Sequence, residues 1–221
     1  MVVKLLIFQT PVLVCALLIA GHCSMYGQPK PISSVEFARI QKHAEELLKT
    51  APSIQESIEE RVDQKTGQFA FWAKRRREVV PPDRERITAE VLNSGVRRKY
   101  VGIRIAETLY TKAEGGDWQT MPDPKEFGGP IPGATSVSSY SFEGMESVSG
   151  IEARVYKVRN NSRYGSGKNE SINSSETTYW FDSSDRYLRT SKDSSNNSKG
   201  RVKVTTTFGY PTILLIEAPI K

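Results

Sequence analysis

The sequence predicts an α+β fold in which a strongly curved antiparallel β-sheet, a half-barrel meander of about ten strands, carries an N-terminal amphipathic helix on its concave face. Three observations predict this fold. Residues 34–49 repeat apolar side chains at helical spacing. After Pro52 the chain is a series of short segments with strand-like alternation, separated by turn signals. Sequential strands joined by short turns pair antiparallel, so the series predicts one meandering sheet.

The first 27 residues indicate a signal for export. Lys4 precedes an apolar run at 5–20, and small or polar residues such as Gly21 and Ser24 follow. This order is typical of a signal peptide, whose apolar stretch has about 7–15 residues, whereas a membrane anchor needs about 20. We therefore expect a signal peptide at 1–27, a single domain at 28–221, and a location in the periplasm or outside the cell. An uncleaved anchor is the alternative.

Cys23 raises the question of a lipid tether. Bacterial lipoprotein signals end in Leu-small-small-Cys, and here His22 stands where a small residue is expected. Lipidation of Cys23 and ordinary cleavage between Cys23 and Gln28 are both open. Cys15 lies inside the apolar run, so the mature chain keeps one cysteine or none and forms no internal disulfide.

The predicted helix begins at a capping signal and ends before a proline. Ser33 and Glu36 fit a capping box, in which the two residues satisfy backbone N–H groups of the first helical turn. We expect the helix at 34–49, ending before Pro52, with one face resting on the sheet. That face comprises Phe37, Ile40, Ala44, Leu47 and Leu48.

Strands in the first half are expected at 53–64, from 69 to the break at Pro81-Pro82, and at 86–92, 96–105 and 108–112. The first of these also fits helical spacing, but its strand-rich surroundings favour a strand. Asn93-Ser94-Gly95 is a hairpin turn. Residues 119–134 hold four prolines and three glycines without periodicity, which predicts a long loop and a candidate lid.

Strands in the second half are expected at 137–148, 151–155, 177–181, 186–191, 201–208 and 212–216. Between them, 160–175 and 193–200 are rich in Ser, Asn and Gly. This composition predicts two polar hairpin tips.

Charge and residue inventory exclude several function classes. The chain has a net charge of +6, and we expect no nucleic-acid partner for an exported protein. Its two basic runs are either solvated strand faces or contacts with an anionic partner such as a membrane surface. His43 is the only histidine certain to remain after cleavage, which argues against zinc ligand sets and against catalysis by a nucleophile–His pair. We expect no catalytic residues, no metal and no cofactor. The basic runs are Lys74-Arg75-Arg76-Arg77 and Arg97-Arg98-Lys99.

Four stretches resemble the LolA/LolB-like lipoprotein-carrier half-barrels and their LppX/LprG relatives of the bacterial envelope. They are the helix with 53–62 and the corner 78–84; the hairpin 103–112 leading to Trp118; 148–156 with 179–182 and 187–189; and the closing 216–219. Ala106 stands where such hairpins often carry glycine. The resemblance implies an incomplete barrel with an apolar cavity for a lipid, acyl chains or another hydrophobic ligand. We expect a monomer that binds this ligand without catalysis.

The aromatic and aliphatic residues that could line such a cavity could equally pack as core. The function that we expect is therefore hydrophobic-ligand binding, and the alternative is a structural or interaction module of the envelope with a filled core. The candidate lining residues are Phe37, Ile40, Leu47, Phe69, Phe71, Trp72, Tyr110, Trp118, Tyr140, Phe142, Tyr156, Tyr179, Trp180 and Phe208.

Overall fold

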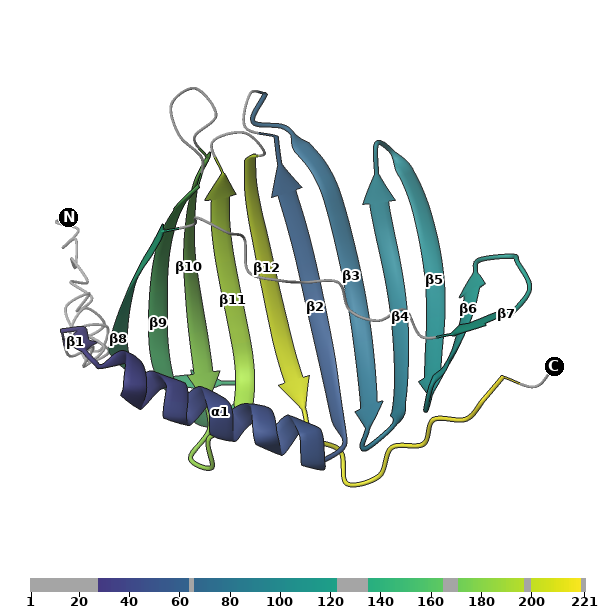
Figure 1. Cartoon of the computed structure of the whole chain (residues 1–221), viewed down its shortest axis with the longest axis horizontal. Coiled ribbons are helices and arrows are strands. Elements are labelled where there is room, and N and C mark those ends of the chain that lie inside the picture. Colours follow the sequence, from purple (N-terminus) through teal and green to yellow (C-terminus); the bar gives the residue numbers. More distant parts are fainter. Residues whose placement is uncertain (1–27, 64–65, 123–134, 165–170, 197–199, 220–221) are drawn as a thin grey trace, which may run out of the picture.

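The computed structural model describes residues 28–63, 66–122, 135–164, 171–196 and 200–219. Over these ranges the chain forms one antiparallel 12-stranded sheet and one helix, α1 (Ser34–Thr50), which lies across the concave face of the open, curved sheet (Figure 1). The predicted fold class is confirmed, with two strands more than the ten or so expected. The strands are β1 (Lys30–Pro31), β2 (Ser53–Val62), β3 (Phe69–Val80), β4 (Arg84–Asn93), β5 (Val96–Ile105), β6 (Thr108–Ala113), β7 (Gln119–Pro122), β8 (Thr135–Val148), β9 (Ile151–Tyr164), β10 (Ser171–Phe181), β11 (Tyr187–Asn196) and β12 (Gly200–Gly209).

The sheet consists of two meanders joined at the middle. Its order is β1-β8-β9-β10-β11-β12-β2-β3-β4-β5-β6-β7. The junction is the pairing of β12 with β2, which runs from Arg201 opposite Val62 to Gly209 opposite Ile54. The first long strand and the last one therefore lie side by side, and each half of the chain builds one half of the sheet.

Helix α1 forms where its sequence signals place it. The Ser33 side chain accepts a hydrogen bond from the Glu36 N–H at 3.1 Å, as expected of an N-cap. The helix ends one residue beyond the predicted limit, where the Ala51 N–H still bonds to the Leu47 carbonyl. In Figure 1, α1 crosses one end of β8 to β12 and reaches β2.

The short hairpins follow their turn residues. Ser94 and Gly95 have φ of 49° and 79°, and Ser149 and Gly150 have φ of 52° and 84°. Positive φ at both central residues is the geometry that suits the right-handed twist of a two-residue hairpin. At the β5–β6 turn, Ala106 adopts a φ of 52°, a conformation that glycine adopts more readily.

Three predictions were wrong in detail. Most of the predicted polar tips are strand, because β9 runs to Tyr164, β10 starts at Ser171 and β11 runs to Asn196. Cross-strand side-chain bonds support this polar ladder, among them Ser174 Oγ to Asn161 Oδ1 at 2.9 Å. Composition alone indicated loops there, but the backbone ladder continues regardless of side-chain polarity.

The segment 212–216 is not a strand. Both sides of β12 are already occupied, by β11 and β2, so a strand that follows it has no neighbouring edge. The tail is held instead by the buried Ile216, whose carbonyl accepts a hydrogen bond from Arg84 Nη1 at 2.9 Å. The predicted loop 119–134 begins as strand β7, and its remainder, 123–134, lies outside the described residues.

Candidate ligand-binding site

Strand alternation divides the candidate residues between the two faces of the sheet. Tyr179 and Phe181 belong to the core cluster beneath α1, which defines the concave face. Trp180, between them, belongs to a second cluster with Val155 and Leu188 on the convex face. Because successive side chains of a strand point to opposite faces, the pairing register carries this assignment across the whole sheet.

The concave face beneath α1 is a filled aromatic core. Phe37 is 3% exposed, and its ring lies 5.5 Å from that of Tyr140, 6.1 Å from Tyr156 and 5.1 Å from Tyr179. The remaining rings continue this contact network, with neighbouring centroids between 4.9 and 6.3 Å apart. Half of the predicted lining residues come together here, namely Phe37, Ile40, Tyr140, Phe142, Tyr156, Tyr179 and Phe208.

The other predicted lining residues are dispersed. Trp180 donates from Nε1 to Glu146 Oε2 at 2.7 Å on the convex face. Trp118 lies under the Lys112 ammonium, 5.9 Å from the ring centroid. On the concave face, Phe71 lies under the Arg61 guanidinium at 4.7 Å. Leu47, Trp72 and Tyr110 are half-buried, Phe69 is exposed, and Cys23 lies outside the described residues.

An apolar hollow lies on the concave face beyond the helix, over β4 to β7. Its volume is about 460 Å³. Ile87 and Tyr100 are 37% and 39% exposed, and α1 does not cross β4 and β5, the strands that carry them (Figure 1). A concave, mostly apolar surface with a few polar groups at its rim is the usual form of a small-molecule site. Its concave-face lining includes Ile87, Ala89, Tyr100, Gly102, Leu109 and Thr111.

A second hollow lies on the same face beside the C-terminal end of α1. Its volume is about 570 Å³. Leu48 forms its helix side, Val79 and Pro82 its sheet side, and the Arg77 side chain closes it toward β4. Arg77 is the cross-strand neighbour of Ile87, which lines the first hollow, so this arginine lies between the two hollows.

Two Arg–Glu–Arg triads lie on the concave face of β2 to β5, and each includes one arginine of β3. Glu59 accepts from Arg75 Nη1 and Arg61 Nε, both at 2.7 Å. Glu85 accepts from Arg77 Nε at 2.6 Å and also pairs with Arg104. Burial disfavours the charged form of both carboxylates, but the hydrogen bonds from these arginines outweigh it and lower the pKa of Glu59 and Glu85. Both glutamates are therefore ionised near neutral pH.

Sequence reasoning missed these triads because it treated the basic run 74–77 as one unit. The register separates it: Arg75 and Arg77 lie on the concave face, whereas Arg76 pairs with Glu56 and Glu78 on the convex face. The detectable signal was the alternation of Arg and Glu along successive strands. Over β2 to β5 the concave face carries five arginines against two glutamates, namely Arg61, Arg75, Arg77, Arg98 and Arg104 against Glu59 and Glu85.

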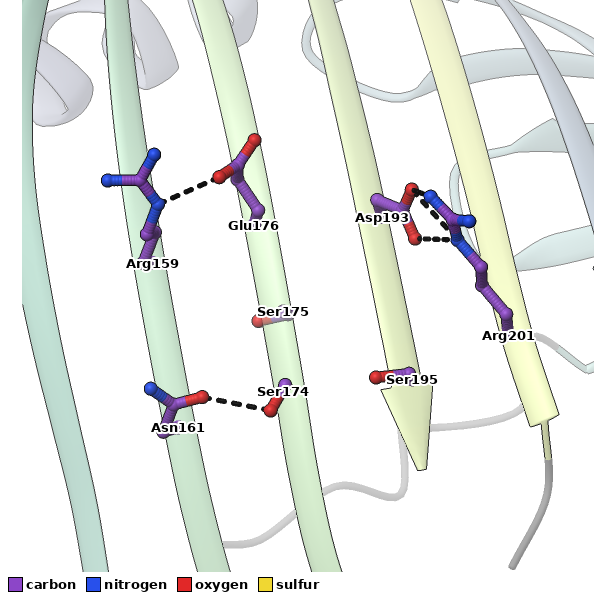
Figure 2. Close-up of a pocket in the computed structure, with 8 residues that line it drawn as sticks. All are labelled: Arg159, Asn161, Ser174, Ser175, Glu176, Asp193, Ser195 and Arg201. Carbon is purple, nitrogen blue, oxygen red and sulfur yellow. Dashed lines mark hydrogen bonds and ion pairs between the residues drawn. The ribbon is translucent and has the colours of Figure 1, made fainter. Parts of the chain in front are cut away.

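The convex face carries a polar groove of about 530 Å³ over β9 to β12 (Figure 2). Its charged side chains pair within the groove, Arg159 Nε with Glu176 at 2.8 Å and Arg201 Nε with Asp193 at 2.8 Å. The hydrogen bond from Arg201 lowers the pKa of Asp193. With two cations matched by two anions, this groove has no net charge to offer a ligand.

The residues that the structure describes contain no group of three or more His, Cys, Asp or Glu side chains that could hold a metal ion. They also contain no helix with the length and apolar character needed to cross a membrane.

Over the residues that the structure describes, the fold is an open antiparallel half-barrel with one covering helix. No family model matches the sequence, and no curated protein is similar to it in sequence. The fold is similar to a domain from Vibrio parahaemolyticus assigned to outer membrane lipoprotein sorting, with 10% identity, a TM-score of 0.31, and coverage of 80% of this chain and 93% of that one. It is also similar to a DUF1329 family protein from Desulfovibrio piger ATCC 29098, with 10% identity, a TM-score of 0.30, and coverage of 80% and 92%. Likenesses at this level carry no argument about the family of this chain or about what it binds.

Proposed function

We propose that this chain is an exported, non-enzymatic binding protein for a lipid, an acyl chain or another hydrophobic ligand. The ligand lies on the concave face over β4 to β7, beside the helix and not beneath it. The observation that carries this proposal is the apolar hollow around Ile87 and Tyr100, on strands that α1 does not cross. The aromatic core beneath α1 supports the sheet and does not itself hold the ligand.

Binding in this hollow needs only the transfer of hydrocarbon out of water. Each buried methylene contributes about 0.8 kcal/mol, which corresponds to about a fourfold change in affinity. Because the hollow is open on one side, a bound chain buries only part of each methylene. We therefore expect a gain of about twofold to fourfold per added methylene, ending at the chain length that fills the hollow.

A series of n-alkanols of increasing length, titrated by calorimetry, tests this proposal with an uncharged probe. Ile87→Asp should abolish the binding, because it places a carboxylate in the hollow. Ile58→Asp is the matched control: Ile58 is 43% exposed on the convex face of β2, so this variant should bind as the parent protein does. Absence of alkanol binding, or an equal loss in both variants with intact circular dichroism, would rule out the hollow as the site.

The filled core beneath α1 favours a second candidate function, an interaction module of the cell envelope without a small ligand. The tight packing of Phe37 against three tyrosine rings is the specific observation. The same titration separates the two functions, since a module of this kind binds no alkanol of any length.

The export part of the proposal rests on residues 1–27 and on Cys23. Intact mass of the protein recovered from cells tests it. A mass lacking the first two dozen or so residues supports cleavage, and an additional diacylglyceryl mass on Cys23 supports a membrane tether. A mass that includes Met1 or residues 2–20 contradicts cleavage.

A further inference from the structure

Resting on the proposed function, we propose that the ligand is an anionic lipid. Arg75 and Arg77 hold its headgroup, a phosphate or a carboxylate, while its hydrocarbon chain lies in the apolar hollow over β4 to β7. Charge and apolar surface meet at this place on the concave face, and their arrangement matches the two ends of an amphiphile.

The position of the two arginines relative to the hollow is set by the register. Arg75 and Arg77 are two residues apart on β3 and share a face, so their Cα atoms are about 6.6 Å apart. Their cross-strand neighbours on β4 are Ala89 and Ile87, and both of these line the hollow. A headgroup at the guanidinium groups therefore stands one strand spacing from the start of the chain-binding surface.

Buried carboxylates hold both guanidinium groups in place. Arg75 Nη1 donates to Glu59 at 2.7 Å and Arg77 Nε to Glu85 at 2.6 Å. Glu59 and Glu85 are 8% and 7% exposed, whereas the arginine side chains are 39% and 44% exposed. The glutamate carboxylates thus lie beneath the arginine guanidinium groups, which face solvent.

Arginine also suits the task chemically. A guanidinium has five N–H donors in a fixed plane, and the glutamates take only part of that set. A held guanidinium loses little further freedom on binding an oxyanion, and its fork matches phosphate and carboxylate oxygens. The five-to-two excess of arginine over glutamate on this face supplies the complementary charge.

Two lipids of equal chain length test the proposal by calorimetry below their critical micelle concentrations: 1-lauroyl lysophosphatidic acid and uncharged 1-monolauroylglycerol. We expect the anionic lipid to bind at least about tenfold more tightly. The double variant Arg75→Gln/Arg77→Gln should lose this preference and keep its affinity for monolauroylglycerol. Arg76→Gln is the matched control, because Arg76 is 43% exposed on the same strand but on the convex face beside Glu56 and Glu78. It should keep both affinities.

The outcomes separate this inference from the proposed function. If neither lipid binds, the proposed function fails and the inference fails with it. If both bind equally, only the headgroup inference fails. An equal loss of preference in Arg76→Gln also overturns it, as does displacement of the lipid by inorganic phosphate at equal concentration. Binding only to intact phosphatidylglycerol vesicles overturns it in favour of a membrane surface.

If the double variant does not fold, the salt dependence of lipid binding to the parent protein tests the role of the two arginines. At 1 M salt the screening length falls to about 3 Å. The preference for lysophosphatidic acid should then shrink severalfold, while monolauroylglycerol binding should hold or strengthen. A preference that does not change with salt overturns the role of the arginines.

Discussion

Truncation of Phe37 tests whether the space beneath α1 is packed core or ligand cavity. In Phe37→Ala the ring that contacts Tyr140, Tyr156 and Tyr179 is removed from a site that is 3% exposed. Buried Phe→Ala changes cost about 3–5 kcal/mol, since the lost transfer energy is joined by the cost of the hole left behind. Three rings fixed in the sheet cannot move far to fill that hole, so we expect a value within this range.

Urea unfolding followed by circular dichroism and tryptophan fluorescence measures this loss. With a slope of about 2 kcal/mol per molar urea, a loss of 4 kcal/mol lowers the unfolding midpoint by about 2 M. Val35→Ala is the control on the same helix, because Val35 is 77% exposed. Its free energy of unfolding should stay within about 0.5 kcal/mol of the parent value.

A loss below about 1 kcal/mol in Phe37→Ala would refute the packed-core reasoning. It would mean that the ring faces a cavity whose walls lose few contacts when it is removed. In that case alkanol binding should also change in this variant, whereas a packed core predicts that alkanol affinity remains unchanged while stability falls.

Three further predictions concern the cap, one turn and the triads. Ser33→Ala removes the N-cap bond to Glu36 and should lower the free energy of urea unfolding by about 1 kcal/mol; no change would mean that the cap is dispensable. Ala106→Gly should raise the free energy of unfolding by about 0.5–1 kcal/mol, and with it the thermal midpoint, because φ is 52° at this turn. Ala70→Gly in β3 is the control and should lower the thermal midpoint. The pKa of Glu85 lies below its ordinary 4.5 in the folded state. Its contribution to the free energy of unfolding is therefore present above pH 4.5 and lost as the pH falls through the lowered value, so acid urea titrations should have a shallower pH dependence in Glu85→Gln.

Local signals account for the part of the fold that the sequence predicts well. Helix α1 and the turn at Ser94-Gly95 are specified by residues within a few positions of each other, namely a cap, a periodic face or two turn residues. The polar strands were missed because Ser and Asn composition indicates loops wherever the partner strand is unknown. Their hydrogen-bonded ladder depends on pairing between residues that are not local in the sequence, such as Asn161 with Ser174, 13 positions apart.

The candidate site depends even more on long-range register. Strand alternation places Arg76 on the face opposite Arg75 and Arg77, but only the pairing of β3 with β2 and β4 shows which of the two faces is the concave one. Trp180 is a simpler case, because period-two alternation between Tyr179 and Phe181 already places it on the other side. The apolar hollow is assembled from β4 to β7, and a single sequence does not reveal which strands of the sheet the helix crosses.

The sheet itself contains the comparison that argues for a ligand. The helix crosses one end of β9 to β11 (Figure 1), and away from that end the concave face of these strands presents Asn160, Ser175 and Ser194. Polar side chains of this kind are sufficient to keep an uncovered sheet face hydrated. Over β4 to β6 the same face instead presents Ile87, Tyr100 and Leu109. Exposed apolar side chains are not stabilised by water, so stability and solubility alone would favour polar side chains on both parts of the concave face. This apolar surface lies beside Arg75 and Arg77, where an amphiphile can use both kinds of surface at once.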